Sequence, residues 1–138
     1  MAKYYEIVIF TAALQEYADQ VVDQIDVGNN IKHRLYRQHT SQNGPFLVKD
    51  LSLLGRDLDR TIIIDNISDN FILQPDNGIF ISTWYDDMSD NFLREITPLL
   101  TELVEKRVPD VRVGMRTYRD QILRQISSGQ QMGNIQFM

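Results

Sequence analysis

The sequence predicts an α/β protein with a parallel sheet. Three short runs of apolar, mostly β-branched residues have the composition of strands that are buried on both faces, and each run ends on polar residues. The runs are Ile7–Phe10, Phe46–Val48 and Thr61–Ile64, and the polar residues that end them are Thr11, Lys49 with Asp50, and Asp65 with Asn66. Ligands of open α/β sheets bind beyond the carboxyl ends of the strands, so these polar residues are the first candidates for a site.

The elements of the first half alternate between strand and helix. After Thr11, apolar residues recur at helical spacing from Leu14 to Ile25, which predicts an amphipathic helix. The stretch Lys32–His39 reads as a strand, and the turn residues Gln42–Pro45 predict a hairpin that joins it to Phe46–Lys49. This alternation is typical of a doubly wound sheet.

The second half continues the pattern. We expect a short helix from Ser68, a turn over Pro75–Gly78 and a strand over Ile79–Ile81. A longer helix is expected to start at Ser89 or Asp90, to be kinked at Pro98 and to end at Pro109. A short helix is expected after Gly114. The residues from Ser127 onward are rich in serine, glycine and glutamine, so we expect a loose end.

Composition limits what the chain can do. Its 138 residues, 43% of them hydrophobic, suffice for one domain with a core. The formal net charge of −5 argues against direct binding to nucleic acid, which needs a strongly basic face. The absence of cysteine excludes disulfides and thiolate ligands and fits a reducing compartment. No apolar run approaches the roughly 18–20 residues that span a bilayer, and no signal-peptide pattern is visible.

Each polar residue at a strand end has two possible roles. Asp65 and Asn66 offer hard oxygen ligands for Mg²⁺, but an Asx turn uses the same residues. Lys49 can neutralise a bound phosphate or pair with a neighbouring aspartate at the surface. The hydroxyl of Thr11 can cap the following helix, bonding the backbone of Ala13 or Leu14, or it can donate to an anion at the helix N-terminus.

The stretch Lys32–His39 contains five basic or titratable side chains. Among them Arg37 presents a planar fork that matches phosphate, so this stretch can clamp a phosphorylated peptide. A solvated edge hairpin that uses charge against aggregation accounts for the same residues. The two histidines, His33 and His39, have no carboxylate at ligand spacing and are weak metal candidates.

Six segments, in this order, resemble one protein family. They are Phe10–Ala13, Tyr36–His39, Val48–Leu58, Ile63–Asn66, Gln74–Asn77 and Ser82–Asp90. They are similar to the small phosphatases of the RNA polymerase II C-terminal domain and their relative Dullard, in the haloacid dehalogenase superfamily. The resemblance implies a Rossmannoid parallel sheet with an inserted hairpin region over approximately 29–46. We therefore predict a phosphatase domain over residues 1–112 and a tail over 113–138.

The resemblance also implies roles for individual residues. The family hydrolyses phosphoserine or phosphothreonine in proteins through an aspartyl-phosphate, with Mg²⁺ as cofactor. By similarity, Thr11 holds a phosphoryl oxygen and Lys49 neutralises the phosphate. Asp65 then belongs to the Mg²⁺ shell, and Asn66 supports both metal and phosphate. Arg37, on the inserted hairpin, grips the phosphorylated substrate.

One part of the family pattern is absent. The first motif, Asp-x-Asp-x-Thr/Val, supplies the nucleophile and the general acid on the central strand, and nothing ahead of Lys3 matches it. Asp57–Thr61 has the same letters, but it precedes its strand instead of ending it, so we do not assign it. We expect the chain as given to be a fragment that lacks the central first strand and is inactive and poorly stable alone. A natural short form and a sheet completed by a swapped or partner strand are the alternatives.

A binding function and a cellular location also follow from the resemblance. The presequence-receptor subunit of the mitochondrial inner-membrane translocase shares this domain, so a non-catalytic binding module is the alternative function. Asp65–Asn66 and the run Asp86–Asp90 fit the phosphatases better. The expected partner is a phosphorylated protein, with a regulatory subunit or strand-completing partner as a further candidate. The expected location is intracellular, in the nucleus or at the periphery of the nuclear or endoplasmic-reticulum membrane.

Overall fold

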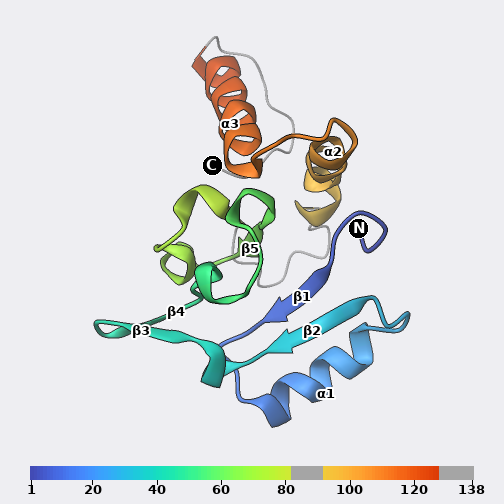
Figure 1. Cartoon of the computed structure of the whole chain (residues 1–138), viewed down its shortest axis with the longest axis vertical. Coiled ribbons are helices and arrows are strands. Elements are labelled where there is room, and N and C mark those ends of the chain that lie inside the picture. The colour runs from blue at the N-terminus through green and yellow to red at the C-terminus, as the bar shows by residue number, and fades with distance from the viewer. Residues whose placement is uncertain (82–91, 128–138) are drawn as a thin grey trace. The chain divides into compact units, whose positions relative to one another are not determined.

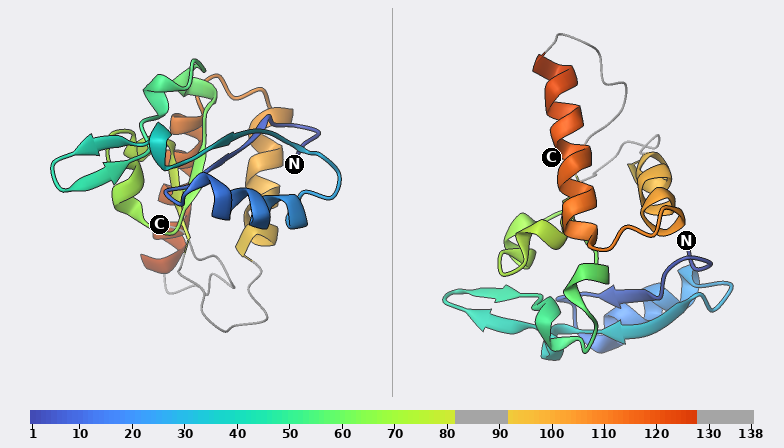
Figure 2. Two further views of the ribbon diagram at one scale, coloured as in Figure 1. Left: turned by 90° about the horizontal axis from the view of Figure 1, so that it is seen from below. Right: turned by 45° about the horizontal axis from the view of Figure 1, so that its top comes forward.

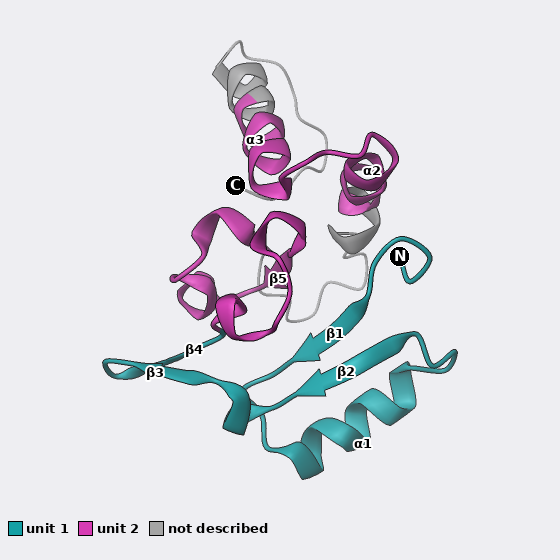
Figure 3. Cartoon of the chain, viewed as in Figure 1, with its two compact units in different colours: residues 1–49 teal, residues 50–138 magenta. Residues whose placement is uncertain are grey.

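The computed structural model describes residues 1–81 and 92–127 of the chain (Figure 1). The described part is α/β, which agrees with the predicted class. Its strands form three separate pairs instead of one parallel sheet, and Phe46–Val48, predicted as a buried parallel strand, is mostly exposed and pairs antiparallel. The chain divides into two compact units, Met1–Lys49 and Asp50–Met138 (Figure 3). In the described part, no helix is both long and apolar enough to cross a membrane.

The first unit contains a parallel strand pair, one helix and a hairpin. β1 (Ile7–Phe10) pairs in parallel with β2 (Ile31–Leu35), and the connecting helix α1 (Gln15–Ile25) lies alongside the pair (Figure 2). β3 (Ser41–Asn43) and β4 (Phe46–Val48) form the antiparallel hairpin. The parallel pair directs the carboxyl ends of β1 and β2 toward the same edge, which is the edge where a site is expected.

The apolar face predicted for α1 is only partly buried. Ala18 and Val22, one turn apart, are buried. Leu14, Tyr17 and Ile25 belong to the same predicted face, and their exposed fractions are 56%, 65% and 63%. The helix itself is confirmed, but it presents a second apolar stripe to solvent in addition to the one that packs.

The predicted strand over Lys32–His39 is wrong in its second half, and so is its pairing with Phe46–Lys49. Residues Arg37–His39 form a 3₁₀ turn, η1, while β2 pairs with β1 and the hairpin partner of β4 is β3. The cause is local. The N–H of Tyr36 donates to Nδ1 of His39 over 2.8 Å, and the N–H of His39 donates to the Tyr36 carbonyl. These bonds satisfy in a turn the groups that a strand would pair with a neighbour.

The second unit contains another parallel pair, β5 (Ile63–Asp65) with β6 (Gly78–Phe80). Four 3₁₀ turns accompany it: η2 (Leu51–Leu53), η3 (Leu58–Arg60), η4 (Ser68–Phe71) and η5 (Pro75–Asn77). Leu51, Ile63 and Phe71 form a buried core to which Leu54, Leu58 and Phe80 add partly buried surface. The core therefore fixes the strand that ends on Asp65.

A buried amide links two turns of this unit. Asn77 is 1% exposed, and its Nδ2 donates to the carbonyl oxygens of Leu58, over 2.7 Å, and Thr61, over 2.8 Å. Both carbonyls belong to the segment that enters β5. The sequence predicts the turn at this position, but not that its asparagine is a structural donor.

Two helices complete the described residues of the second unit, α2 (Phe92–Glu105) and α3 (Val111–Ser127). Pro98 lies inside α2, which continues through it as one helix; the predicted start at Ser89 or Asp90 lies outside the described residues. α2 ends ahead of the predicted Pro109, because Arg107 adopts φ +51° and the N–H of Val108 bonds back to the Leu103 carbonyl, as in a Schellman turn. α3 has 17 residues and packs against η3 and η5. The loose end was predicted from Ser127, but Ser127 is the last residue of α3, and the residues after it are outside the described part.

Candidate functional site

The loop Phe10–Ala13 follows the carboxyl end of β1 and holds the first candidate residue. The N–H of Thr11 donates to the Leu35 carbonyl, which ties the loop to the end of β2. The Thr11 hydroxyl oxygen accepts from the N–H of Ala13 over 3.0 Å, so its own proton remains available for an acceptor. The predicted bond to Ala13 is present, but Thr11 is not the helix cap, because α1 has Leu14 at its N-cap position.

Arg37 is fixed to the same loop by two hydrogen bonds. Its Nε donates to the Ala12 carbonyl over 2.6 Å, and its backbone N–H donates to the Ala13 carbonyl over 3.2 Å. The prediction that Arg37 lies on the inserted hairpin is wrong, since it opens η1. In the described part of the chain, Nη1 and Nη2 of Arg37 have no hydrogen-bond partner. Because Nε is already bonded to the Ala12 carbonyl, these two terminal nitrogens are the ones that can bind an anion.

Three other basic or titratable residues of this stretch, His33, Arg34 and His39, have partners of their own. Arg34 donates Nη1 to Asp19 and forms an ion pair through Nη2 with Asp23, at 3.1 and 2.9 Å. His33 lies 3.5 Å from Glu6, and His39 accepts its backbone bond within η1. The basic cluster predicted from the sequence is therefore divided: Arg34 pairs with carboxylates of α1, whereas Arg37 is bonded to the loop ahead of that helix.

Lys49 also lies against the loop. It directly follows β4, and its Nζ lies 5.8 Å from the centre of the Phe10 ring, within range of a cation–π contact. Thr11, Arg37 and Lys49 together are called the loop site below. It carries two formal positive charges and a hydroxyl donor, and the loop itself contains no carboxylate. These donors suit an oxyanion such as a phosphoryl group.

Asp65 and Asn66 belong to the second unit. Asp65 ends β5 and is 7% exposed; its Oδ1 accepts from the N–H of Ile67 over 3.0 Å, which is the predicted Asx turn. Nδ2 of Asn70 lies 3.2 and 3.1 Å from the two carboxylate oxygens. The sequence analysis missed Asn70, although its position five residues after Asp65, in a short turn, was a usable signal.

The donor set around Asp65 fits Mg²⁺ as part of a shell. The carboxylate and the exposed amide of Asn66 are hard oxygen ligands, and Mg²⁺ commonly binds through one or two carboxylates while it keeps several waters. Among the described residues there is no group of three or more histidine, aspartate or glutamate side chains that could hold a metal ion. Asp65 and Asn66 would therefore supply only part of the shell of such an ion.

A hollow of the first unit lies elsewhere. It has a volume of about 500 Å³ and is lined by Ala2, Lys3, Tyr4, Tyr5, Glu6, Lys32 and His33. These residues lie at the amino-terminal ends of β1 and β2, opposite the edge where parallel strands place their ligands. The hollow is open, so we do not assign the site to it. The segment Asp57–Thr61 is likewise no site: it forms η3 ahead of β5, with the Thr61 hydroxyl bonded to the Asp57 carbonyl.

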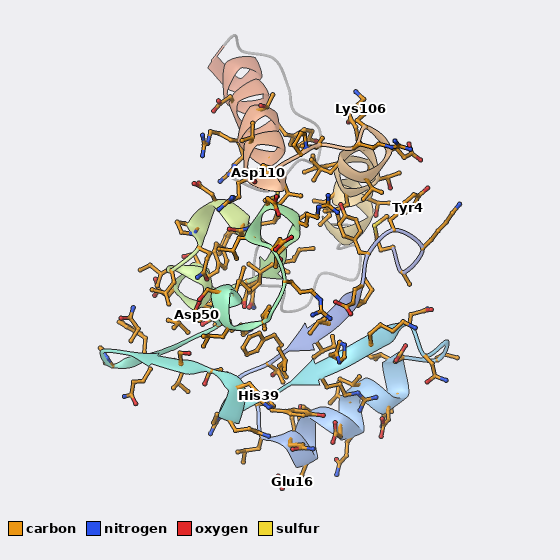
Figure 4. All side chains as sticks on the ribbon, viewed as in Figure 1. Tyr4, Glu16, His39, Asp50, Lys106 and Asp110 are labelled. Atoms are coloured by element: carbon orange, nitrogen blue, oxygen red, sulfur yellow. The ribbon has the colours of Figure 1, made fainter. Side chains whose placement is uncertain are left out.

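The segment that follows Lys49 is held by an amide. Gln74 accepts the N–H of Leu51 at Oε1, over 3.0 Å, and donates Nε2 to Oδ1 of Asp50, over 2.8 Å. Asp50 also caps η2 by accepting the N–H and hydroxyl of Ser52 (Figure 4). Hydrogen bonds from the Ser52 hydroxyl and then from Gln74 hold the pKa of Asp50 below its usual value.

This lowered pKa makes stability depend on pH. An aspartate whose pKa is depressed in the folded state contributes its full stability above its unfolded pKa of about 4, and the contribution disappears as the pH falls through the folded pKa. We expect Asp50→Asn to lose less stability than the parent when the pH is lowered from neutral to below about 4, measured as the urea midpoint. Asp69→Asn, at an exposed aspartate, is the control. Parallel pH profiles for the parent and Asp50→Asn would contradict the role of Asp50.

The sequence matches a known family over most of its length. Residues 1–112 match the family model described as NLI interacting factor-like phosphatase. The chain belongs to this phosphatase family. The match confirms the resemblance that the motifs indicate, and the matched range contains all five candidate residues, namely Thr11, Arg37, Lys49, Asp65 and Asn66.

Several relatives of this NLI interacting factor-like phosphatase domain carry phosphatase names. A probable C-terminal domain small phosphatase of Dictyostelium discoideum is 45% identical over 82% of this chain and 36% of its own length. The human carboxy-terminal domain RNA polymerase II polypeptide A small phosphatase 1 is 40% identical over 86% of this chain and 45% of its own. Phosphatase Herzog of Drosophila melanogaster is 42% identical over 75% of this chain and 29% of its own length. The chain thus spans less than half the length of these relatives.

Proposed function

We propose that this domain binds the phosphoryl group of a phosphoserine or phosphothreonine protein and, in a complete catalytic centre, hydrolyses it. The observation that carries the proposal is the loop site, where a hydroxyl donor, a guanidinium fork and an ammonium group lie against one four-residue loop. Positively charged donors fixed before the ligand arrives stabilise the charge that develops on a transferring phosphoryl group.

Each residue of the proposal has a distinct task. Thr11 donates its hydroxyl proton to a phosphoryl oxygen, Lys49 neutralises the phosphate, and the open end of the Arg37 fork holds a further oxygen. Asp65, with Asn66 beside it, would hold Mg²⁺. When bound, Mg²⁺ would supply charge neutralisation and orient the phosphate. Buried Asp65 is already oriented by Ile67 and Asn70, so little freedom is lost when it binds an ion.

Residues 1–138 alone are proposed to bind phosphate without hydrolysing it. The first aspartate of the chain is Asp19, within α1, so the carboxylate that attacks phosphorus in this family has no counterpart ahead of Lys3. The absence of the first motif also leads to a proposal about the sheet. We propose a haloacid-dehalogenase-like Rossmannoid sheet that is complete only with a strand bearing the first motif. A nuclear location, or one at the nuclear or endoplasmic-reticulum membrane, is proposed from the family alone.

The test is Mg²⁺-dependent hydrolysis of a chromogenic aryl phosphate, measured for residues 1–138 and for the chain extended upstream by its natural coding sequence. We expect activity in the extended form only, because it would add the missing nucleophile. Activity in residues 1–138 alone would contradict our account of the nucleophile. Absence of activity in both, with a folded and monomeric short chain, would favour a binding module. The relatives named above are phosphatases and give no support to a presequence receptor.

A further inference from the structure

Three consecutive residues, Tyr36, Arg37 and Gln38, are each bonded to the segment that contains the start of α1. The Tyr36 hydroxyl donates to Oδ1 of Asp19 over 2.5 Å. Arg37 bonds to the loop ahead of α1 through Nε and its backbone N–H. Nε2 of Gln38 donates to Oε1 of Gln15 over 3.1 Å. Gln15 and Asp19 are one turn apart on α1, so they lie on the same helix face. From this face they hydrogen-bond the residues on either side of Arg37 in the sequence.

These tethers matter because Arg37 itself lies at an exposed turn. An exposed arginine has many rotamers, and ordering one upon ligand binding costs affinity. Here Tyr36, which is 7% exposed, anchors the turn from one side, and the Thr40 hydroxyl closes it by donating to the Arg37 carbonyl over 2.6 Å. The backbone of Arg37 is thus fixed at both ends before a ligand arrives.

Asp19 is distinguished from its neighbour on the helix by the Tyr36 bond. Asp19 and Asp23 both bind Arg34, but among the described contacts only Asp19 also accepts from Tyr36. The Tyr36 hydroxyl is the main cause of a lowered pKa at Asp19, and Asp19 in turn raises the pKa of Tyr36. Asp23 therefore provides a matched comparison, because it also pairs with Arg34 but does not accept the hydrogen bond from Tyr36.

We propose that Asp19 and Gln15 are positioning residues that hold the Tyr36–Gln38 turn so that the Arg37 fork is oriented for a phosphoryl group. This rests on the proposed function for the ligand, but the orientation of Arg37 is a property of the chain itself. Asp19 acts through Tyr36, and Gln15 acts through Gln38. Neither residue touches the ligand.

The experiment uses residues 1–138 and two readouts. The first is the Nε–Hε signal of Arg37 in ¹H–¹⁵N NMR, whose hydrogen exchange reports the bond to Ala12 without any ligand. The second is the affinity for inorganic phosphate. We expect Tyr36→Phe and Asp19→Ala to accelerate exchange of this signal and to weaken phosphate binding roughly three- to tenfold, the effect of one net hydrogen bond. Asp19→Asn keeps an oxygen that can accept the Tyr36 hydroxyl, so this variant should largely preserve both the slow exchange of the Arg37 signal and the affinity for phosphate.

The control is Asp23→Ala, which removes an Arg34 ion pair and leaves the Tyr36 bond, and it should change neither readout. In an Arg37→Ala background, Asp19→Ala should cause no additional loss of phosphate affinity, since the two residues act through one group. Equal effects of Asp19→Ala and Asp23→Ala, or a full additional loss without Arg37, would overturn the proposal. Circular dichroism checks that each variant is folded. If Asp19→Ala unfolds the protein, Tyr36→Phe, which deletes only one oxygen atom, replaces it as the test of the Tyr36–Asp19 bond.

The two proposals can fail separately. If the parent does not bind phosphate, or binds it equally well with Arg37→Ala, the loop site is wrong as an anion site, and the NMR signal still decides whether Asp19 orients Arg37. If phosphate binding requires Arg37 but neither readout responds to Tyr36→Phe and Asp19→Ala, the positioning role is wrong and the loop site stands.

Discussion

Asn77→Asp is expected to cause the largest loss of stability of any single substitution considered. The amide of Asn77 donates two hydrogen bonds to buried carbonyls, whereas a carboxylate would place negative oxygen against them and would have to ionise at a site that is 1% exposed. A buried charge without a partner costs about 3–5 kcal/mol, a large part of the roughly 5–15 kcal/mol that stabilises a typical domain. We expect the second unit to be largely unfolded at pH 7 by circular dichroism and urea titration.

The pH dependence of this variant separates charge from packing. Burial and the two carbonyls would raise the pKa of the new carboxyl, so protonation would return a donor and part of the lost stability. The deficit relative to the parent should therefore be smaller at pH 5 than at pH 7. Asn43→Asp, at an exposed strand residue, is the control and should stay within about 0.5 kcal/mol of the parent. A folded Asn77→Asp protein at pH 7 would contradict the role of Asn77 as a buried donor.

The second large effect concerns activity. In a phosphatase-active protein that contains this domain, Lys49→Ala or Asp65→Ala should abolish phosphate release. Removal of one preorganised charge typically lowers kcat by about 10²–10³-fold, because the transition state carries more charge than the substrate. The measurement is the initial rate of aryl phosphate hydrolysis at saturating Mg²⁺ for Lys49→Ala and across a Mg²⁺ titration for Asp65→Ala.

Two basic residues outside the proposed chemistry serve as controls for this experiment. Arg124→Ala, in the tail, should retain activity. Lys106→Ala removes an exposed lysine that pairs with Glu102 one helical turn earlier, and it should retain activity as well. If Arg124→Ala lost as much activity as Lys49→Ala, the assignment of chemistry to the strand ends would be wrong.

The regular elements could be predicted because their signals are local. The apolar runs at Ile7–Phe10 and Thr61–Ile64 and the helical spacing from Leu14 to Ile25 each predict an element of the correct type with near-correct bounds. The turn at Arg37–His39 could not be predicted in the same way, since alternating side chains over Lys32–His39 favour a strand. The bond from the Tyr36 N–H to the His39 imidazole decides between the two, and composition does not reveal it.

The candidate site could be predicted in part for a similar reason. Thr11 and Lys49 directly follow strands and Asp65 is the last residue of one, so their placement at strand ends was visible in the sequence. Asp19 was missed because an acidic residue on an amphipathic helix reads as part of a solvated face. Its partner Tyr36 lies 17 positions away, and such pairs appear only when the crossover brings α1 beside β2. The burial of Asn77 was missed for the same reason, since its partners Leu58 and Thr61 precede it by 19 and 16 positions.

The outer stripe of α1 has a consequence for the chain in solution. Leu14, Tyr17 and Ile25 keep more than half of their surfaces exposed, and water released from such side chains favours any association that covers them. The colloidal behaviour of the isolated chain should therefore depend on its concentration and on excluded salts such as sulfate, which strengthen apolar association. Low concentration and low sulfate therefore limit association through this stripe during measurements at the opposite face of the same helix.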